Sequence, residues 1–288
     1  MSLVTLLHSR IIYNHRLLDA SRALAPLVSP VTLYGRGVFT TLALHEGRPF
    51  LWHEHWARLR EHAARTCLDL SELDEESVSA SLAQLIEANH VKNGRARITL
   101  LANEECGIWR IKKSAARRTD LLIMTGEPHS TSEESLALTV SPYRVNTHSP
   151  LAGIKSVNYL ENILAWEEAR ARDFDEAVRL NERGEVVSGV MANLFWVTDG
   201  TLHTPALTTG ALAGTTRASV IKLAGEISVP HVEGVYELAD VGDADEIFLT
   251  SAGHGLRLVT VFDFHRYTIP IGSIALRLHE AFRQLTLS

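Results

Sequence analysis

A polar, turn-rich stretch divides this chain of 288 residues into two parts, each of which alternates between strand-like and helix-like patterns. Residues 126–135, GEPHSTSEES, hold few apolar side chains and many residues typical of turns. Single hydrophobic cores usually stop growing near this chain length, so two packed domains are expected. We predict a mixed α/β fold with one α/β domain at 1–125, an interdomain linker at 126–135 and a second α/β domain at 136–288.

Hydrophobic periodicity predicts the elements of both parts. The first part is expected to contain strands at 4–7, 11–13, 38–44, 96–101 and 120–125, helices at 52–66 and 71–89, and a long loop at 103–118. The second part is expected to contain strands at 136–140, 176–180, 193–197, 246–250 and 258–262, and helices at 158–172, 216–227 and 274–285. In the first of these last helices, Leu160, Ile163 and Leu164 are expected to face a core.

Composition excludes several classes of function. A formal net charge of −6 and the absence of a long basic run argue against nucleic-acid binding and favour a small-molecule partner. The two cysteines, Cys67 and Cys106, show neither disulfide nor zinc-site spacing, which fits a reducing cytoplasm. No apolar run approaches the roughly 20 residues of a membrane span. We expect a cytoplasmic protein that binds neither membrane nor metal.

Lysine is scarce enough for each one to be weighed as a carbonyl-attacking amine. Such a lysine must spend time neutral, which requires partial desolvation or a cationic neighbour. Four of the five read as solvated by their polar or turn contexts: Lys92, Lys112, Lys113 and Lys222. Lys155 alone lies in an apolar and glycine-containing context, PLAGIKSVNY, directly before a predicted helix. The alternative is a surface lysine whose stem lies along apolar side chains.

Two segments have the composition of anion sites. Residues 210–217, GALAGTTR, place glycine and hydroxyls before a helix, where free N–H groups and the helix dipole favour a phosphate. Thr215 and Thr216 equally fit ordinary helix capping. Residues 250–253, TSAG, follow a predicted strand and could equally be a polar turn. Together with Lys155, these segments indicate a phosphorylated carbonyl cofactor.

Several ordered motifs along nearly the whole chain resemble the class IV aminotransferases, the pyridoxal-phosphate (PLP) fold type IV family. The family includes branched-chain and D-amino acid aminotransferases and 4-amino-4-deoxychorismate lyase. The matching motifs are Tyr34-Gly-x-Gly-x-Phe39, His55-x-x-Arg58-Leu59, Lys155-x-x-Asn158-Tyr159-Leu160, Asn193-x-Phe195, Thr204-Pro205, Leu212-x-Gly-x-Thr216-Arg217 and Glu246-x-Phe248. The resemblance implies a two-domain, D-amino acid aminotransferase-like fold with a barrel-like C-terminal domain that carries the PLP lysine, and a homodimer.

The resemblance also implies roles for individual residues. Lys155 would carry PLP as a Schiff base and move the proton during catalysis, and Arg58 would hold the phosphate. The implied cofactor-binding residues are Arg58, Lys155, Tyr159, Ser188, Thr215, Thr216, Ser251 and Ala252. Without the family pattern, Arg58 would read as a surface ion pair with Glu54 or Glu61. Candidate substrate-binding residues are Tyr34, Arg36 and Trp109, although the last two could merely stabilise loops, and Phe39 reads as core packing.

Two positions depart from the family pattern. Ser188 occupies the place where members usually have a glutamate that hydrogen-bonds the protonated pyridine nitrogen. A hydroxyl cannot hold that nitrogen protonated as a carboxylate does, so transamination should suffer more than elimination. Ala102 stands where the lyases tend to have an arginine, which leaves recognition of a substrate carboxylate open.

Segments around Thr40, Lys155 and Asn193 look most like the aminodeoxychorismate lyases. We therefore expect a lyase that eliminates pyruvate to give 4-aminobenzoate, in folate biosynthesis. An aminotransferase acting on D- or branched-chain L-amino acids is the alternative, and a catalytically silent PLP-binding protein is a third.

Overall fold

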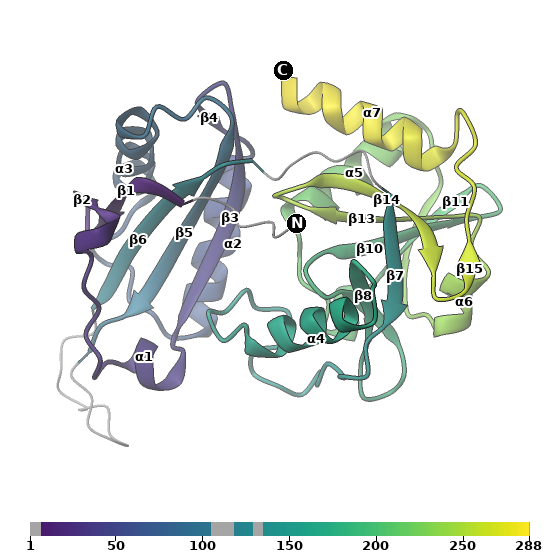
Figure 1. The fold of residues 1–288 in the computed structure, drawn as a ribbon, viewed down its shortest axis with the longest axis horizontal. Coiled ribbons are helices and arrows are strands. Elements are labelled where there is room, and N and C mark those ends of the chain that lie inside the picture. The colour runs from purple at the N-terminus through teal and green to yellow at the C-terminus, as the bar shows by residue number, and fades with distance from the viewer. Residues whose placement is uncertain (1–6, 105–117, 129–134, 288) are drawn as a thin grey trace. The chain divides into compact units, whose positions relative to one another are not determined.

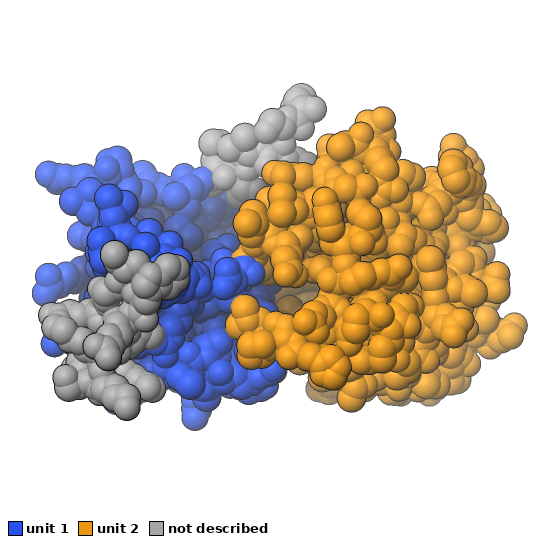
Figure 2. All heavy atoms as spheres, turned by 90° about the horizontal axis from the view of Figure 1, so that it is seen from below, with its two compact units in different colours: residues 1–130, 154–158 blue, residues 131–153, 159–288 orange. Residues whose placement is uncertain are grey.

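The computed structural model describes residues 7–104, 118–128 and 135–287, and the chain divides into two compact units. Unit 1 comprises residues 1–130 and 154–158, and unit 2 comprises residues 131–153 and 159–288; Figure 2 colours them separately. The chain first changes unit within the predicted linker, of which residues 129–134 lie outside the described ranges. The prediction that Lys155 belongs to the C-terminal domain differs from this division, because residues 154–158 hydrogen-bond to a strand of unit 1.

Unit 1 forms, over its described residues, a six-stranded antiparallel sheet in the order β2-β1-β6-β5-β3-β4 (Figure 1). Its elements are β1 (Leu7–Tyr13), β2 (Arg16–Asp19), a 3-10 turn (Ala20–Arg22), α1 (Pro30–Tyr34), β3 (Gly37–His45), β4 (Arg48–Pro49), α2 (Trp52–Arg65), α3 (Glu75–Ala88), β5 (Gly94–Ala102) and β6 (Thr119–Gly126). Helix α3 begins later than predicted because Asp74 caps it, accepting from the backbone N–H of Ser77 at 2.8 Å.

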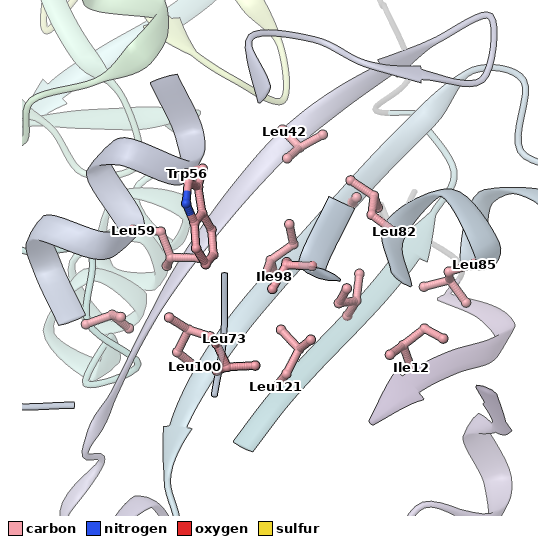
Figure 3. Close-up of a cluster of buried hydrophobic side chains, with 14 of the residues drawn as sticks. Ile12, Leu42, Trp56, Leu59, Leu73, Leu82, Leu85, Ile98, Leu100 and Leu121 are labelled. Atoms are coloured by element: carbon pink, nitrogen blue, oxygen red, sulfur yellow. The ribbon is translucent and has the colours of Figure 1, made fainter. Parts of the chain in front are cut away.

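One hydrophobic core joins α2 and α3 to the sheet of unit 1. Strand β3 alternates, so that Val38, Leu42 and Leu44 point into this core while Phe39 and Thr41 point to the opposite face. Figure 3 shows the cluster, which includes Ile12, Leu42, Trp56, Leu59, Leu73, Leu82, Leu85, Ile98, Leu100 and Leu121. Thr40 lies on the core face of the same strand and is fully buried, which makes it a polar position that needs hydrogen-bond partners.

Unit 2 is built on a nine-stranded mixed sheet, as far as its described residues extend, in the order β12-β11-β10-β13-β14-β7-β8-β9, with β15 paired to β14. Its elements are β7 (Leu136–Val140), α4 (Leu160–Ala171), β8 (Glu176–Leu180), β9 (Val186–Gly189), β10 (Asn193–Thr198), β11 (Thr201–Pro205), a 3-10 turn (Leu207–Thr209), α5 (Thr215–Glu226), β12 (His231–Gly234), α6 (Leu238–Gly242), β13 (Glu246–Ser251), β14 (Gly255–Phe262), β15 (His265–Arg266) and α7 (Ile274–Leu287).

A hydrogen bond links the two edges of this sheet, strand β9 and the segment that follows strand β12. The backbone N–H of Val186, in β9, donates to the carbonyl of Tyr236, two residues beyond β12, at 2.8 Å. This bond is consistent with the barrel-like domain that the family resemblance implies. No helix in the described part of the chain is long and apolar enough to cross a membrane.

The prediction that Leu160, Ile163 and Leu164 face a core is wrong, because these side chains are 66%, 39% and 46% exposed. Helix α4 instead packs through Ala165 and Ala169, which are fully buried. Small side chains allow the helix to approach the sheet closely, and the larger apolar residues are left on its outer face.

Candidate active site

The lysine segment extends the edge of β3 in unit 1. The backbone N–H of Phe39 donates to the carbonyl of Lys155 at 2.9 Å, and the N–H of Val157 donates to the carbonyl of Gly37 at 3.0 Å. Val38 and Ser156 form an antiparallel bridge between these two bonds. Lys155 is therefore fixed in register beside Phe39, although 116 positions separate them in sequence.

Helix α2 presents His55, Arg58 and His62 on one face, because residues three, four and seven apart share a side of a helix. All three are buried. The Nη2 of Arg58 donates to the Oγ1 of Thr40 at 2.9 Å, and that oxygen lies 2.7 Å from the Nδ1 of His55. Since the threonine oxygen already accepts from Arg58, its own proton is directed to the histidine.

These histidines are neutral at pH 7. Burial lowers the pKa of His55 to about 3 and that of His62 to about 4, and in both cases Arg58 adds repulsion. The Nδ1 of His62 accepts the backbone N–H of Lys155 at 3.1 Å, which requires an unprotonated nitrogen there. The histidines thus position Arg58 and the lysine backbone and add no positive charge.

The Lys155 amine shares the Phe39 ring with a second cation. Its Nζ lies 4.5 Å from the ring centroid, and the Cζ of Arg97 lies 3.7 Å from the same centroid. Burial lowers the pKa of Lys155 to about 7, and repulsion from Arg58 and Arg97 contributes to the shift. A large fraction of the amine is therefore neutral near pH 7, which is the state that attacks a carbonyl. Phe39, predicted as core packing, is buried and contacts both cations through its ring.

In unit 2, β8 and β9 bring Ser188 opposite Arg179 in an antiparallel pair. The Ser188 hydroxyl donates to the carbonyl of Gly189 at 2.6 Å. The turn that follows is held by the buried carboxylate of Glu176, which accepts the N–H groups of Val190 at 2.7 Å and Met191 at 2.9 Å. Burial raises the pKa of Glu176 to about 7, while these N–H bonds act in the opposite direction.

The predicted phosphate segment of unit 2 is a helix start without a side-chain cap at its first position. Gly214 is the N-cap of α5, and the buried Thr215 and Thr216 begin the helix. The Nδ2 of Asn193 donates to the carbonyl of Leu212 at 2.8 Å and so fixes the loop before the helix. A methyl group at position 214 would overlap the Oδ1 of Asn193, so this position requires glycine.

The other predicted cofactor residues of unit 2 lie at element ends. Tyr159 is the N-cap residue of α4. Ser251 ends β13, its Oγ lies 3.3 Å from the Nδ1 of His254, and Ala252 follows in a turn. The neighbouring Thr250 is buried, and its Oγ1 has no hydrogen-bond partner among the described residues. An unsatisfied buried hydroxyl beside a hydroxyl-rich turn fits an anion-binding position.

The predicted substrate residues have less direct support. The Arg36 guanidinium donates to Glu104 at 3.0 Å and to the carbonyl of Cys67 at 2.9 Å, which is the loop-stabilising role weighed from the sequence. Tyr34 is partly exposed, and its carbonyl accepts from Asn158. Trp109 lies outside the described residues.

Sequence reasoning missed four residues that the structure brings to these clusters: His62, Arg97, Glu176 and Arg179. For Arg97 and Arg179, the available signal was an arginine in the middle of an apolar strand. The partner of each, however, depends on strand pairing that the sequence alone does not display.

Comparison with known proteins decides the family. The model of the family described as "Amino-transferase class IV" matches residues 37–262. This protein belongs to the class IV aminotransferase family. A provisionally named branched-chain-amino-acid aminotransferase of Methanocaldococcus jannaschii is 31% identical over 281 residues, covering 96% of each chain. The aminodeoxychorismate lyase of Bacillus subtilis is 34% identical over 224 residues, covering 76% of this chain and 75% of its own.

Solved structures agree with this class IV assignment. The Escherichia coli branched-chain amino acid aminotransferase superposes with a TM-score of 0.89 at 25% identity, covering 97% of this chain and 95% of its own. Similar structures include a PLP-bound form, that of the Thermobaculum terrenum branched-chain aminotransferase. The predicted fold class is confirmed, and the protein is a PLP-dependent enzyme of this family.

The donor sets fit PLP at two positions and depart from the family pattern at a third. Unit 1 offers an amine that is substantially neutral near pH 7 beside the Arg58 cation. Unit 2 offers the α5 start and the unsatisfied Thr250 hydroxyl, which suit a phosphate. At the third position, Ser188 stands in place of the family's glutamate, and its cross-strand neighbour on β8 is Arg179 and not a carboxylate.

Proposed function

We propose that Lys155 is the catalytic lysine and that this enzyme eliminates pyruvate from an aminodeoxychorismate-like substrate to give 4-aminobenzoate. The observation that supports the catalytic role most strongly is the lowered pKa of Lys155, about 7, produced by burial and by two arginines. A lysine with this pKa can attack a carbonyl carbon as the neutral amine. It can also accept and return a proton at neutral pH.

The other predicted residues receive binding roles in this proposal. Arg58, oriented by Thr40 and His55, binds the cofactor phosphate as a charged donor, and the N–H groups at the start of α5 add further donors. The hydroxyl groups of Thr215, Thr216 and Ser251 and the backbone of Ala252 are proposed as further donors to the phosphate. Tyr159 is proposed to lie near the phenolic oxygen of the cofactor. PLP, when bound, supplies a conjugated ring that withdraws electrons from the substrate carbon bearing the amine.

Elimination is favoured over transamination by Ser188. In elimination, Lys155 takes the proton from the carbon bearing the amine, the bond from the neighbouring carbon to the enolpyruvyl ether oxygen breaks, and the ring becomes aromatic. The enolpyruvate that leaves takes up one proton, equal to the one removed, to become pyruvate. The electron pair leaves with the departing group, so little ring protonation is needed. Transamination must instead hold that pair until a proton arrives at the cofactor carbon, which a carboxylate partner assists and a serine does not.

An aminotransferase acting on D- or branched-chain L-amino acids is the second candidate. It is favoured by Ala102, a buried apolar residue where the lyases tend to have an arginine. It is also favoured by the similarity to the Methanocaldococcus jannaschii protein over 96% of both chains.

The first experiment tests the lysine. Purified protein with added PLP should show the visible absorbance band of a Schiff base, and borohydride reduction followed by peptide mapping should place the label on Lys155. Lys155→Met should abolish both signals. Lys222→Met is the matched control, because Lys222 is 79% exposed and pairs with Glu226, and it should leave them unchanged. A label on another lysine would refute the assignment.

The second experiment separates the two activities. With aminodeoxychorismate, the lyase should release pyruvate and fluorescent 4-aminobenzoate in equal amounts while the visible band of the cofactor returns after each turnover. With D-alanine or L-leucine alone, an aminotransferase would convert the band to that of the amine form and release one 2-oxo acid per site. Conversion of the band without 4-aminobenzoate formation would establish the second candidate.

We also propose that the protein is a homodimer that buries the outer face of α4. Leu160, Ile163 and Leu164 share one face of this helix and are exposed. Light scattering should give twice the chain mass, and Ile163→Lys should lower it toward one chain. Leu207→Lys, at a residue of similar exposure in the same unit, is the control and should remain dimeric. A monomeric wild type would contradict the proposal.

A further inference from the structure

Glu176 is a buried carboxylate that the chemistry proposed above does not use. It begins β8, is 6% exposed, and accepts hydrogen bonds from the backbone with both of its oxygens. Its Oε1 accepts the N–H groups of Ala177 at 3.0 Å and Val190 at 2.7 Å, and its Oε2 accepts that of Met191 at 2.9 Å. Because these donors carry no formal charge, they offset only part of the cost of burying a carboxylate. A carboxylate kept under these conditions indicates a segment that has to be held in place.

The segment that Glu176 holds is the turn at 190–192, which joins β9 to β10. The carboxylate accepts two N–H groups of this turn, and the Nδ2 of Asn162, on α4, donates to the carbonyl of Val190 at 2.6 Å. The Val190 side chain is 3% exposed and packs in the small apolar cluster that joins α4 to β8. Two side chains from different elements, Glu176 and Asn162, therefore clamp the backbone of the turn, and we call them the turn clamp.

The turn leads directly into Asn193, the first residue of β10. The Nδ2 of Asn193 donates to the carbonyl of Leu212 at 2.8 Å, and a methyl group at Gly214 would lie 2.0 Å from its Oδ1. The Asn193 amide thus packs against the loop that precedes α5. Asn193 is also the direct cross-strand partner of Thr250, so the two side chains lie on one face of the sheet.

Two features that suit an anion therefore meet at Asn193. The N-cap of α5, Gly214, has no side chain that could cap the helix, and the N–H groups and dipole of a helix start favour a phosphate. The Thr250 hydroxyl is buried and has no hydrogen-bond partner among the described residues. A shift of Asn193 would move the loop before α5 relative to this hydroxyl, and hydrogen bonds weaken steeply once their geometry is lost.

Glu176 cannot hold an anion directly. Both of its oxygens already accept backbone N–H groups, and a carboxylate repels a phosphate. Its effect on the site must pass through the turn and Asn193.

We propose that Glu176 is a positioning residue for the cofactor phosphate: by holding the 190–192 turn it fixes Asn193, which in turn fixes the start of α5 beside Thr250. This inference rests on the proposed function, because it takes the start of α5 as the phosphate site. Every contact on which it depends lies within unit 2.

The test uses Glu176→Gln, which keeps the size of the side chain and replaces one accepting oxygen by an NH2 group. In the cofactor-free protein, hydrogen exchange of the amides in 190–193 and 212–216 should become faster. The Kd for PLP, from titration of the visible band, should rise by about tenfold, the effect of one lost hydrogen bond. Asn162→Ala removes the other half of the turn clamp and should change the exchange and the Kd in the same direction. Since Asn162 is only half-buried, this variant decides the question if Glu176→Gln does not fold.

Val241→Ala is the matched control for lost stability. Val241 lies on α6 and is fully buried in the main core of unit 2. This variant should lower the unfolding temperature to a similar extent and leave both the exchange of 212–216 and the Kd for PLP unchanged. If the turn-clamp variants behave like Val241→Ala, with lower stability but unchanged exchange and Kd, the proposal is overturned.

Binding of inorganic phosphate separates this inference from the proposed function, because it does not require the lysine. The Kd for phosphate in the cofactor-free protein, followed by phosphorus NMR, should rise in Glu176→Gln and stay the same in Val241→Ala. If no visible band forms with PLP but phosphate binding weakens in this way, only the proposed function fails. If the band forms on Lys155 and Glu176→Gln binds PLP and phosphate as the wild type does, only the role of Glu176 is lost.

Discussion

Replacing Arg97 with methionine should raise the pKa of Lys155 by an amount that the structure bounds. The Arg97 Cζ and the Lys155 Nζ lie 3.7 Å and 4.5 Å from one ring centroid, so the two charges are at most 8.2 Å apart. At an effective dielectric constant of about 20, the repulsion at that separation is about 2 kcal/mol. This equals about 1.5 pKa units, and solvent around the partly exposed lysine reduces it to about 1.

The pKa of Lys155 in Arg97→Met is therefore expected near 8, compared with about 7 in the wild type. The assay follows the rate of visible-band formation when PLP is added to cofactor-free protein between pH 6 and 10. Only the neutral amine reacts, so the midpoint of the rate profile reports its pKa. The midpoint should move upward, and the rate at pH 7 should fall by about fivefold, because the neutral fraction drops from about one half to about one eleventh.

Arg95→Met is the matched control. Arg95 lies two residues earlier on the same face of β5, and its Nε donates to the carbonyl of Glu127 at 3.1 Å. The midpoint should stay within about 0.3 units in this variant, since Arg95 is absent from the charges that shift the lysine. An unchanged or lower midpoint in Arg97→Met, with Arg95→Met behaving normally, would refute the role of the arginine.

Gly214→Ala should weaken PLP binding at least tenfold, because the methyl group overlaps a neighbouring asparagine, whereas a methyl group at Gly225 meets only an ordinary contact with His231 at 4.0 Å, so Gly225→Ala should bind normally in the same titration. Glu176→Gln should lower the free energy of unfolding by about 2–3 kcal/mol, because one of its two accepting oxygens becomes an NH2 group that faces a backbone N–H; Glu182→Gln, at a more exposed carboxylate, should destabilise the protein less in urea. The His62 pKa is about 4 in the folded state against 6.5 unfolded, so the unfolded chain binds more protons between these values and stability falls as pH drops through them. This part of the pH dependence contributes at most about 3 kcal/mol to the free energy of unfolding, and His62→Asn should lose it. Urea unfolding at pH 7 and pH 4.5 measures the effect, and a variant that loses as much stability between these pH values as the wild type would contradict the prediction.

Local patterns in the sequence were sufficient for the long elements. The strands at 136–140 and 176–180 have the predicted bounds, and the helices differ from prediction at their ends, where caps such as Asp74 decide the first residue. The short strands β9, β11 and β12 were missed, because four or five residues carry too little periodicity to stand out.

The chemistry around the lysine was predictable only in part. Lys155 was singled out by its context, but the partners that lower its pKa come from β5 and α2, and long-range pairing decides which of them are near. The error at Leu160, Ile163 and Leu164 has a related cause. An apolar stripe on a helix shows that a surface is to be covered, but it does not show whether the same chain covers it.

The pairing of residues 154–158 with β3 limits how this protein can be divided. A fragment ending at residue 130 would keep Arg58, Arg97 and the histidines but would lose the lysine, and the edge at Gly37–Phe39 would be left with unsatisfied backbone groups. A fragment beginning at 131 would carry the lysine without the arginines that lower its pKa, and its amine should then titrate like an ordinary lysine. The reactive amine is thus a property of the intact polypeptide, and neither half should form a Schiff base as the whole chain does.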